Sequence, residues 1–335
     1  MDSTLHNNLT VIIPTHNRET YLLRSLSYWQ DIEVRVIIVD SSAAAPKLDL
    51  PRHIEYFHFP DTSFSGKVKT AMDMVQTPYV VMCADDDFLV EQGMLACVTF
   101  LQENANYDAA QGRHVSFKGD DGLVIKEIYR SDDDFNVCCD DMGQRVIQGL
   151  SNYTLWYWSV HRSATLKLVY REYETVSNGN LIEIGVAIGH LAKGGHIQLP
   201  GFYQARESLP QSWGRVEPEL SFDDSDHSDI IEWRKRTLTI ISELSGVSMA
   251  EAEQVLKQGE TAYQQFFDSA RTAKAKRYNQ IINVLPLPVI KLLKWCKRQL
   301  RGQQAANGRF IPQQQFVWPD EQAKQSWQKI MQYLD

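Results

Sequence analysis

The sequence predicts an α/β protein in which a mixed, mostly parallel sheet is flanked by helices and followed by a C-terminal helical extension. Apolar runs typical of buried strands occupy residues 9–13, 34–39, 53–59 and 78–84. Segments with apolar residues at helical spacing lie between them, as in 19–30. Strands that alternate with helices pair in parallel, because each helix carries the chain back across the sheet.

The next part of the chain predicts further strands and helices. Residues 107–119 and 123–130 are expected to form antiparallel strands joined by a Gly-Asp-Asp-Gly turn. Residues 153–169 predict a strand that leads into a helix. A helix over 180–193 is stopped by two glycines, and a short strand follows at 196–200.

The character of the sequence changes after about residue 215. An acidic linker leads there into a long stretch with helical patterns. We therefore expect a first domain over 1–215 and a helical C-terminal region over 216–335, which is available to a membrane or a partner.

The composition is that of an ordinary soluble globular protein, with 43% hydrophobic and 23% charged residues in 335. No apolar stretch reaches the roughly 18 residues of a spanning helix, and the first residues lack a signal-peptide pattern. We therefore expect a cytoplasmic protein. The five cysteines include no CxxC pair, which favours reduced thiols over zinc or redox chemistry.

The net charge of −8 is unevenly distributed along the chain. Residues 1–268 carry 22 Lys and Arg against 39 Asp and Glu, whereas residues 269–319 carry ten Lys and Arg and no acid. The acidic body argues against nucleic-acid binding, and the basic segment predicts an anionic partner. Residues 285–302 place apolar and basic side chains on opposite faces of a helix, as in helices that lie on an anionic membrane. A helix docked on the domain with a basic outer face is the alternative.

Polar residues follow three of the predicted strands: PTHNR at 14–18, DSS at 40–42 and ADDD at 84–87. The carboxyl ends of parallel strands meet at one edge of a sheet, where ligands collect. We therefore expect a binding site at this edge. A second DDDF, at 132–135, has no apolar run before it and is predicted to be a solvated turn.

Four segments in this order resemble nucleotide-sugar glycosyltransferases of the GT-A fold, of the broad family 2 type. They are VIIPTHNR, VIIVDSS, TPYVVMCADDDF and NLIEIGVAIGHLAKGGHIQLP, and the resemblance covers about residues 9–205. It implies a GT-A domain, with a Rossmann-like sheet, over 1–215. It also implies transfer of a sugar from a nucleotide sugar to a hydroxyl group.

The aspartates are the metal site that this resemblance implies. A departing nucleoside diphosphate needs cationic stabilisation, which Mn²⁺ or Mg²⁺ supplies when held by one or two carboxylates. The last aspartate of the family's motif usually touches the metal. We therefore expect Asp87 to be the main ligand, with Asp85 and Asp86 assisting it and contacting the nucleotide.

The nucleoside is expected next to the ends of the first two strands. A carboxylate at Asp40 can accept the N3–H of uracil or thymine, which favours a UDP- or dTDP-linked donor over a CDP-linked one. A helix cap or turn former is the alternative reading of Asp40. Pro14 and Thr15 are expected beside the nucleoside. Arg18 either reaches the same pocket or lies on the surface.

Two lysines stand where many members of the family have an arginine. Lys67 and Lys69 fall in this region, and a lysine can serve as a point charge on phosphate. We expect one of them to bind the nucleotide, with Lys69 slightly preferred. A solvated lysine on a helix face is the alternative for each.

The general base is expected at Glu183. Family members often have Glu-Asp there, with the aspartate as base, but this chain has Ile184 at the second position. Glu183 either took over the role in an inverting mechanism or binds the acceptor. The alternative is that Glu183 is structurally paired or exposed and that the base lies elsewhere. Trp158 and His161 are weaker candidates for the acceptor site, and a satisfied core histidine is the alternative for His161.

The chain after the last sheet strand is a candidate lid. Residues 206–214 could cover the diphosphate with Arg206 and Trp213.

The resulting expectation is a metal-dependent glycosyltransferase acting on a glycan or lipid-linked acceptor in cell-surface polysaccharide synthesis, with peripheral attachment at the inner face of the membrane. Two alternatives remain. A catalytically degenerate GT-A scaffold is compatible with Ile184 and the missing arginine. A sugar-nucleotide nucleotidyltransferase shares the sheet but should have a Gly-rich N-terminal loop, which PTHNR lacks.

Overall fold

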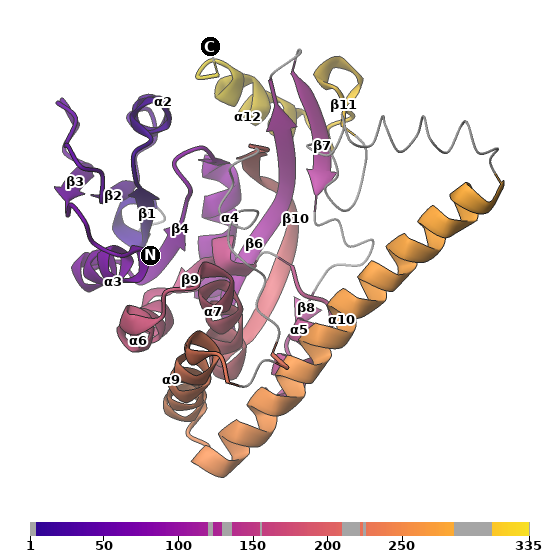
Figure 1. The fold of residues 1–335 in the computed structure, drawn as a ribbon. Coiled ribbons are helices and arrows are strands. Elements are labelled where there is room, and N and C mark those ends of the chain that lie inside the picture. Colours follow the sequence, from indigo (N-terminus) through magenta and orange to yellow (C-terminus); the bar gives the residue numbers. More distant parts are fainter. Residues whose placement is uncertain are drawn as a thin grey trace.

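A computed structural model describes residues 5–119, 123–128, 136–154, 156–209, 222–223, 226–284 and 310–334. It confirms the predicted α/β class: a mixed sheet lies between helices, and further helices follow (Figure 1). The strands of the main path run in the order β11-β7-β6-β9-β4-β1-β2-β3, and β10 joins β5, β6 and β8.

Four parallel strands form the first half of the sheet, as the apolar runs predict. They are β1 (Leu9–Thr15), β2 (Arg35–Asp40), β3 (Ile54–His58) and β4 (Tyr79–Met82). The short helix α1 (Leu5–Asn8) precedes β1. Helix α2 (Glu19–Trp29) connects β1 to β2, and α3 (Phe64–Met74) connects β3 to β4. Helix α4 (Glu91–Glu103) follows β4 in the chain. In register, Thr15 lies beside Asp40, which brings the polar ends of β1 and β2 together.

The second half of the sheet is mostly antiparallel. Strands β6 (Tyr107–Lys118) and β7 (Val124–Ile128) form the predicted hairpin, and β9 (Val160–Arg162) joins β6 to β4. The strand expected at 196–200 is longer: β10 spans Gly195–Glu207 and pairs in parallel with β6. Short strands complete the sheet at β5 (Phe88–Leu89), β8 (Asn136–Val137) and β11 (Ile311–Pro312). Arg206, expected in a lid, therefore belongs to the sheet.

The remaining helices are α5 (Met142–Ser151), α6 (Ser163–Glu172), α7 (Gly179–Lys193), α9 (Ser228–Ser245), α10 (Met249–Val284) and α12 (Glu321–Met331). Single turns of 3₁₀ helix lie at η1 (Trp156–Trp158), η2 (Tyr173–Thr175) and η3 (Gln313–Gln315). A strand that includes Trp156 and Trp158 was expected, so this expectation is wrong. Both side chains are buried in the 3₁₀ turn, rather than alternating across a strand.

Alternate residues of the central strands face two separate cores. Ile12 of β1 packs with the core that includes residues of α3, α6 and α7. Val11 and Ile13 pack with the core that includes residues of α2, α4 and α12. Each fully buried side chain of this kind contributes about 1.5–3 kcal/mol, so a one-residue shift in register would lose both cores.

The C-terminal part of the chain has two different environments. Helices α9 and α10 pack beyond α7 and α5, and α10 extends away from the sheet (Figure 1). Residues 310–334 return to the sheet, where β11 pairs with β7 and Trp327 packs 5.5 Å from Phe117. The proposed division after residue 215 stays a prediction, and these contacts connect 310–334 to the sheet of the first segment.

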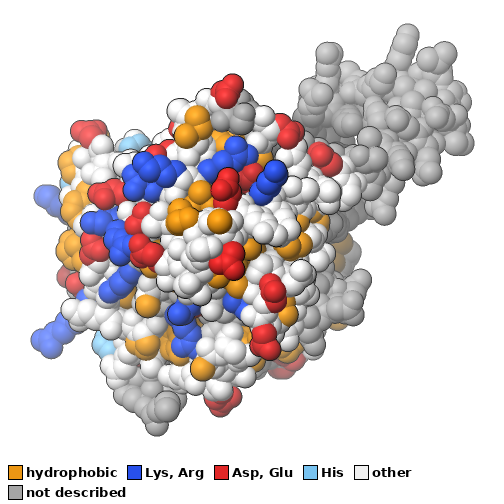
Figure 2. Space-filling model, turned by 90° about the horizontal axis from the view of Figure 1, so that it is seen from below, with side chains coloured by type: hydrophobic (Ala, Val, Ile, Leu, Met, Phe, Trp, Pro, Cys, Tyr) orange, Lys and Arg blue, Asp and Glu red, His pale blue; other side chains and the backbone are white. Residues whose placement is uncertain are grey.

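The basic segment 285–302 lies outside the described residues, so its proposed membrane contact stays a prediction. None of the helices in the described ranges is long and apolar enough to cross a bilayer. Figure 2 shows acidic and basic side chains interspersed on one face of the molecule, without a broad patch of one sign among the side chains described there.

Four histidines form a buried cluster between β6, β9, β10 and α7: His114, His161, His190 and His196, each with 0% exposure. His196 stacks on Trp156 at 4.5 Å, and His190 lies 5.2 Å from both His161 and His196, measured between ring centroids. Burial lowers the pKa of His161 to about 4 and that of His190 well below its usual value. His161 therefore has no surface to present to an acceptor, and the alternative of a core histidine describes its position.

This cluster makes stability depend on pH. A histidine whose folded pKa lies below its unfolded pKa takes up its proton on unfolding, so stability is lost as pH falls below about 6.5. We expect His190→Phe to gain stability relative to the wild type by about 1.4 kcal/mol per pH unit between about pH 6 and pH 4.5. Urea unfolding at several pH values measures this difference. Buried carboxylates with a raised pKa change the stability with pH in the opposite direction. They are present in both proteins, so the difference in stability between variant and wild type reports the contribution of the His190 imidazole. A difference that does not change with pH would contradict the prediction.

Candidate active site

The triplet Asp85, Asp86 and Asp87 is buried, with exposures of 3, 7 and 3%. After β4 ends, the Asp87 backbone N–H donates to the Ala84 carbonyl (3.1 Å), which closes a tight turn. Directly after Asp87, β5 pairs with β10. The turn therefore has a fixed strand on each side, and the three carboxylates are presented from a rigid part of the sheet.

Two residues from the end of β1 contact the first two aspartates. The Thr15 hydroxyl donates to Asp85 (2.6 Å), and the Arg18 guanidinium forms ion pairs with Asp85 and Asp86, both at 2.7 Å. Arg18 also lies 4.3 Å from the ring centre of Tyr21. Arg18 therefore reaches the site rather than lying apart on the surface.

The third aspartate is held from β10. Oδ2 of Asp87 accepts from Gln204 Nε2 (3.0 Å) and Arg206 Nε (3.2 Å), and Oδ1 accepts from the Glu207 backbone N–H (3.1 Å). The guanidinium of Arg206 lies 5.2 Å from the ring centre of Trp158, which is 9% exposed. Two of the residues proposed for the acceptor site or the lid, Arg206 and Trp158, therefore lie near the aspartates.

Asp40 ends β2 and is also buried. Its Oδ1 accepts from the backbone N–H (2.7 Å) and hydroxyl (2.5 Å) of Ser42, and its Oδ2 accepts from the Tyr56 hydroxyl (2.7 Å). Asp40 thus makes the local hydrogen bonds of a turn former, which is the alternative role considered for it. These bonds leave one lone pair of Oδ2 unused.

The two candidate lysines have different environments. Ser63 caps the N-terminus of α3, where its hydroxyl accepts a hydrogen bond from the Gly66 N–H (3.1 Å). Lys67 lies in the first turn of this helix and points inward. Lys67 Nζ donates to the Thr15 carbonyl (2.5 Å) and the Ser41 hydroxyl (2.9 Å). Lys69, the preferred candidate, instead forms an ion pair with Asp73 at 3.0 Å on an exposed part of α3. The structure therefore places Lys67, and not Lys69, beside the carboxylates.

Burial dominates the electrostatics of the site. It raises the pKa of Asp85 to about 6 against the opposing charge of Arg18, and that of Asp87 to about 7 against that of Arg206. Burial also lowers the pKa of Lys67 to about 8, although Asp40 and Asp85 oppose this shift. The carboxylates are thus incompletely compensated, and an additional cation would favour their ionised form.

The donor set fits a hard divalent cation that is shared with a substrate. Carboxylate oxygens are the ligands that Mg²⁺ and Mn²⁺ prefer, and Oδ1 of Asp87 has a lone pair beyond its bond to Glu207 N–H. Within the described ranges, no group of three or more His, Cys, Asp or Glu side chains could hold an ion alone. Phosphate and water oxygens would have to complete the coordination.

Glu183 lies on α7. Asn178 caps this helix by accepting from Leu181 N–H (3.1 Å). Glu183 is half-buried, and its charge, after burial, helps to raise the pKa of Tyr157 and Tyr170. Ile184 is buried in the core. Pro14 is half-buried within β1, opposite Val39, and Trp213 lies outside the described residues.

Several contact residues were not predicted from the sequence. Arg24 forms an ion pair with Glu207 (2.6 Å) and donates to the Asp86 carbonyl (3.1 Å), and Gln204 and Tyr56 contact aspartates directly. Alternating polar residues at 204 and 206 were a signal that one face of this strand contacts polar groups.

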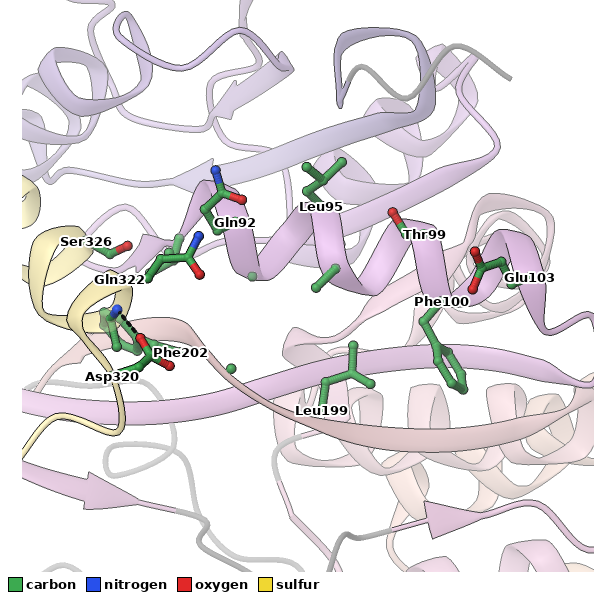
Figure 3. A pocket seen from close by; sticks show the side chains of 15 residues that line it. Gln92, Leu95, Thr99, Phe100, Glu103, Leu199, Phe202, Asp320, Gln322 and Ser326 are labelled. Carbon is green, nitrogen blue, oxygen red and sulfur yellow. Dashed lines mark hydrogen bonds between the residues drawn. The ribbon is translucent and has the colours of Figure 1, made fainter.

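A separate cavity of about 540 Å³ lies between α4, β10 and α12 (Figure 3). Leu95 and Phe100 of α4, Leu199 of β10, and Asp320 before α12 are among the residues that line it. None of the predicted site residues does so. This cavity is therefore distinct from the carboxylate site.

A parallel βαβ half-sheet with buried carboxylates at its strand ends, joined there by a lysine from α3 and an arginine from the loop after β1, is the arrangement expected of a GT-A-type glycosyltransferase. Comparison with known proteins agrees. Residues 10–172, nearly half of the chain, match the family described as "Glycosyl transferase family 2". This segment is similar to that family, and the match supports a glycosyltransferase.

Solved structures show the same fold. The crystal structure of the 1–349 fragment of S. aureus TarS matches with a TM-score of 0.52 and 17% identity, covering 77% of this chain and 72% of that one. The same fragment in complex with UDP-GlcNAc gives a TM-score of 0.47, 15% identity, and coverage of 77% and 73%. For the longer S. aureus TarS the values are 0.46, 16%, 74% and 42%. No curated protein matches the chain. At 17% identity, the first of these matches establishes the fold alone.

The two lysines of α3 provide a matched test of the site's construction. Lys67→Met removes two buried hydrogen bonds and a charge near Asp40 and Asp85, so we expect the free energy of unfolding at pH 7 to fall by about 1–3 kcal/mol. Lys69→Met removes an exposed ion pair and should leave it unchanged within experimental error. Urea unfolding measures both, and equal losses would contradict the different placement of the two side chains.

Proposed function

We propose that the protein is a metal-dependent glycosyltransferase that moves a sugar from a UDP- or dTDP-linked donor to a hydroxyl of a glycan or lipid-linked acceptor, in the synthesis of cell-surface polysaccharide. The observation that carries this proposal is the convergence of Thr15, Arg18 and Lys67 on the buried aspartates at one edge of the sheet. This edge is where α/β sheets bind their ligands.

The nucleoside is recognised in this proposal at the end of β2. The lone pair of Asp40 Oδ2 that Tyr56 and Ser42 leave unused can accept the N3–H of uracil or thymine. Cytosine has an acceptor at N3 and would be repelled by the carboxylate. The hydrogen bond of Tyr56 fixes the orientation of this carboxylate, which is why we favour UDP and dTDP over CDP.

The diphosphate lies next to the triplet in this proposal. Asp87 through Oδ1, assisted by Asp85, would hold Mn²⁺ or Mg²⁺, which supplies Lewis-acid stabilisation of the leaving diphosphate. Arg18 and Lys67 add positive charge beside the phosphates, and Asp86 stays paired with Arg18. Because these groups are fixed before substrate binds, they need little reorganisation when charge develops on the leaving group.

Glu183 is the proposed general base in an inverting transfer, since Ile184 replaces the usual aspartate. Trp158 and Arg206 lie at the same edge as the triplet and are proposed to face the donor sugar or the acceptor. Closure by the segment that contains Trp213 and membrane contact through 285–302 belong to the proposal as well.

The second Asp-Asp-Asp sequence of the chain provides a matched control for the metal site. We expect UDP with Mn²⁺ to raise the melting temperature of wild-type protein and of Asp134→Ala, and not that of Asp87→Ala. The reason is that Asp87 follows a buried strand that presents it to the ligand, whereas no apolar run precedes Asp134 in the sequence. Thermal unfolding with UDP, dTDP and CDP, each with and without Mn²⁺, measures the effect and the choice of base.

Equal stabilisation of wild type and Asp87→Ala would show that Asp87 does not hold the cation. Stabilisation by no nucleotide would instead favour a degenerate GT-A scaffold in glycan assembly.

A second variant tests the base. Glu183→Gln removes the proton acceptor and keeps the shape, so we expect sugar transfer to fall by about 10²–10⁴-fold while the affinity for UDP and Mn²⁺ stays within about twofold. Glu174→Gln, an exposed acid of η2, is the control and should retain wild-type transfer. Transfer by Glu183→Gln at the wild-type rate would exclude this base. Initial rates and calorimetric titration measure the two quantities.

A further inference from the structure

The carboxylate of Asp87 accepts a hydrogen bond from buried Gln204, and His114 lies opposite Gln204 in the sheet; the proposed function does not yet use these two residues. We propose that His114 and Gln204 are positioning residues, which fix the orientation of the Asp87 carboxylate for the cation. This inference rests on the proposed function, because it assigns a role in binding the same cation.

The sheet places Gln204 of β10 between strand β5, which follows Asp87, and strand β6, which carries His114. In the register of β10, Gln204 lies opposite Leu89 of β5, two residues after Asp87, and opposite His114 of β6. Gln204 and His114 are both fully buried, with 0% exposure. The pairing of β10 with β5 and β6 therefore determines the sequence of contacts from His114 through Gln204 to Asp87.

The direction of the hydrogen bond determines how the amide of Gln204 is oriented. An ionised carboxylate only accepts hydrogen bonds, so the Gln204 group 3.0 Å from Asp87 Oδ2 has to be the NH₂. The amide oxygen is then the atom of Gln204 that can accept from another residue. The register of the sheet places His114 opposite Gln204, and both side chains are fully buried, so we assign the His114 N–H as the donor that faces this oxygen. Burial lowers the pKa of His114 to about 3, so the ring is neutral at pH 7 and has a single N–H to donate.

The consequence for Asp87 follows from the number of lone pairs. Gln204 and Arg206 use both lone pairs of Oδ2, and the backbone N–H of Glu207 uses one of Oδ1. The remaining position on Oδ1 is the one we assign to the cation. If His114 is lost, the amide of Gln204 can turn its oxygen toward Asp87, which repels the carboxylate and rotates Oδ1 away from this position.

Loss of any buried histidine could disturb the structure, so the test of His114 needs a control at another buried histidine. His190 has the same 0% exposure and belongs to the same cluster, but its contacts are with Val186, Trp156, His161 and His196. His190→Phe is therefore a matched control. It removes an equally buried imidazole and leaves the contacts of Asp87 in place.

The test measures Mn²⁺ binding to the full chain at pH 7.5 with saturating UDP, by the electron paramagnetic resonance signal of free Mn²⁺. Partners that orient metal ligands affect metal affinity by about 10–100-fold. We expect His114→Phe, which keeps an aromatic ring but cannot donate, to weaken Mn²⁺ binding by at least about tenfold. His114→Gln, which restores a donor, should return it to within about threefold of wild type. His190→Phe should leave it unchanged.

Equal weakening by His114→Phe and His190→Phe, or no weakening by His114→Phe, would overturn the positioning role while the proposed function stands. Wild-type protein that binds no Mn²⁺ in the presence of UDP would overturn both. If His114→Phe does not fold, Gln204→Met decides, because it keeps the side-chain length and removes the amide. Wild-type Mn²⁺ affinity of Gln204→Met would overturn the proposal, and a loss of about tenfold would support it.

Discussion

The energetic problem at the centre of this fold is the burial of three consecutive carboxylates. Isolated charges of this kind are strongly destabilised away from water, and adjacent carboxylates repel each other. Arg18, Arg206 and Lys67 reduce this cost, and they come from three different elements: the loop after β1, strand β10 and helix α3. The aspartate turn can therefore form in its present position only when these elements have been assembled around it.

Strand β10 connects this charge cluster to the rest of the sheet. It pairs with β6 along its length and with β5 at the aspartate turn. Its last residues place one amide, one guanidinium and one backbone N–H around Asp87. The antiparallel half of the sheet thus supplies the contacts that hold a residue presented by the parallel half. A site that is built across both halves requires the whole sheet, and the contacts from Gln204, Arg206 and Glu207 lie outside the family match to 10–172.

The parts of the fold that could be predicted are those in which local pattern determines structure. The apolar runs before Thr15, Asp40 and Asp85 predicted both the parallel strands and the edge where these residues meet. The contact between Gln204 and Asp87 could not be predicted, because it joins residues 117 positions apart and depends on the pairing of β10. Which of Lys67 and Lys69 lies beside the carboxylates could not be predicted either, for a physical reason. Two positions along a helix correspond to about 200° of rotation, and the sequence did not show which face was buried.

The return of residues 310–334 to the sheet has a consequence for the order of events during synthesis. Trp327 packs on Phe117, and Tyr333 lies 5.4 Å from Tyr28 and donates to Asp31, so residues 310–334 cover side chains of α2 and β6. Until residues 310–334 have been synthesised, the surface around Tyr28 and Phe117 is exposed to water. The nascent chain must keep this apolar surface from aggregating until α12 has emerged from the ribosome. The sheet can therefore bury these side chains only after α12 has been made.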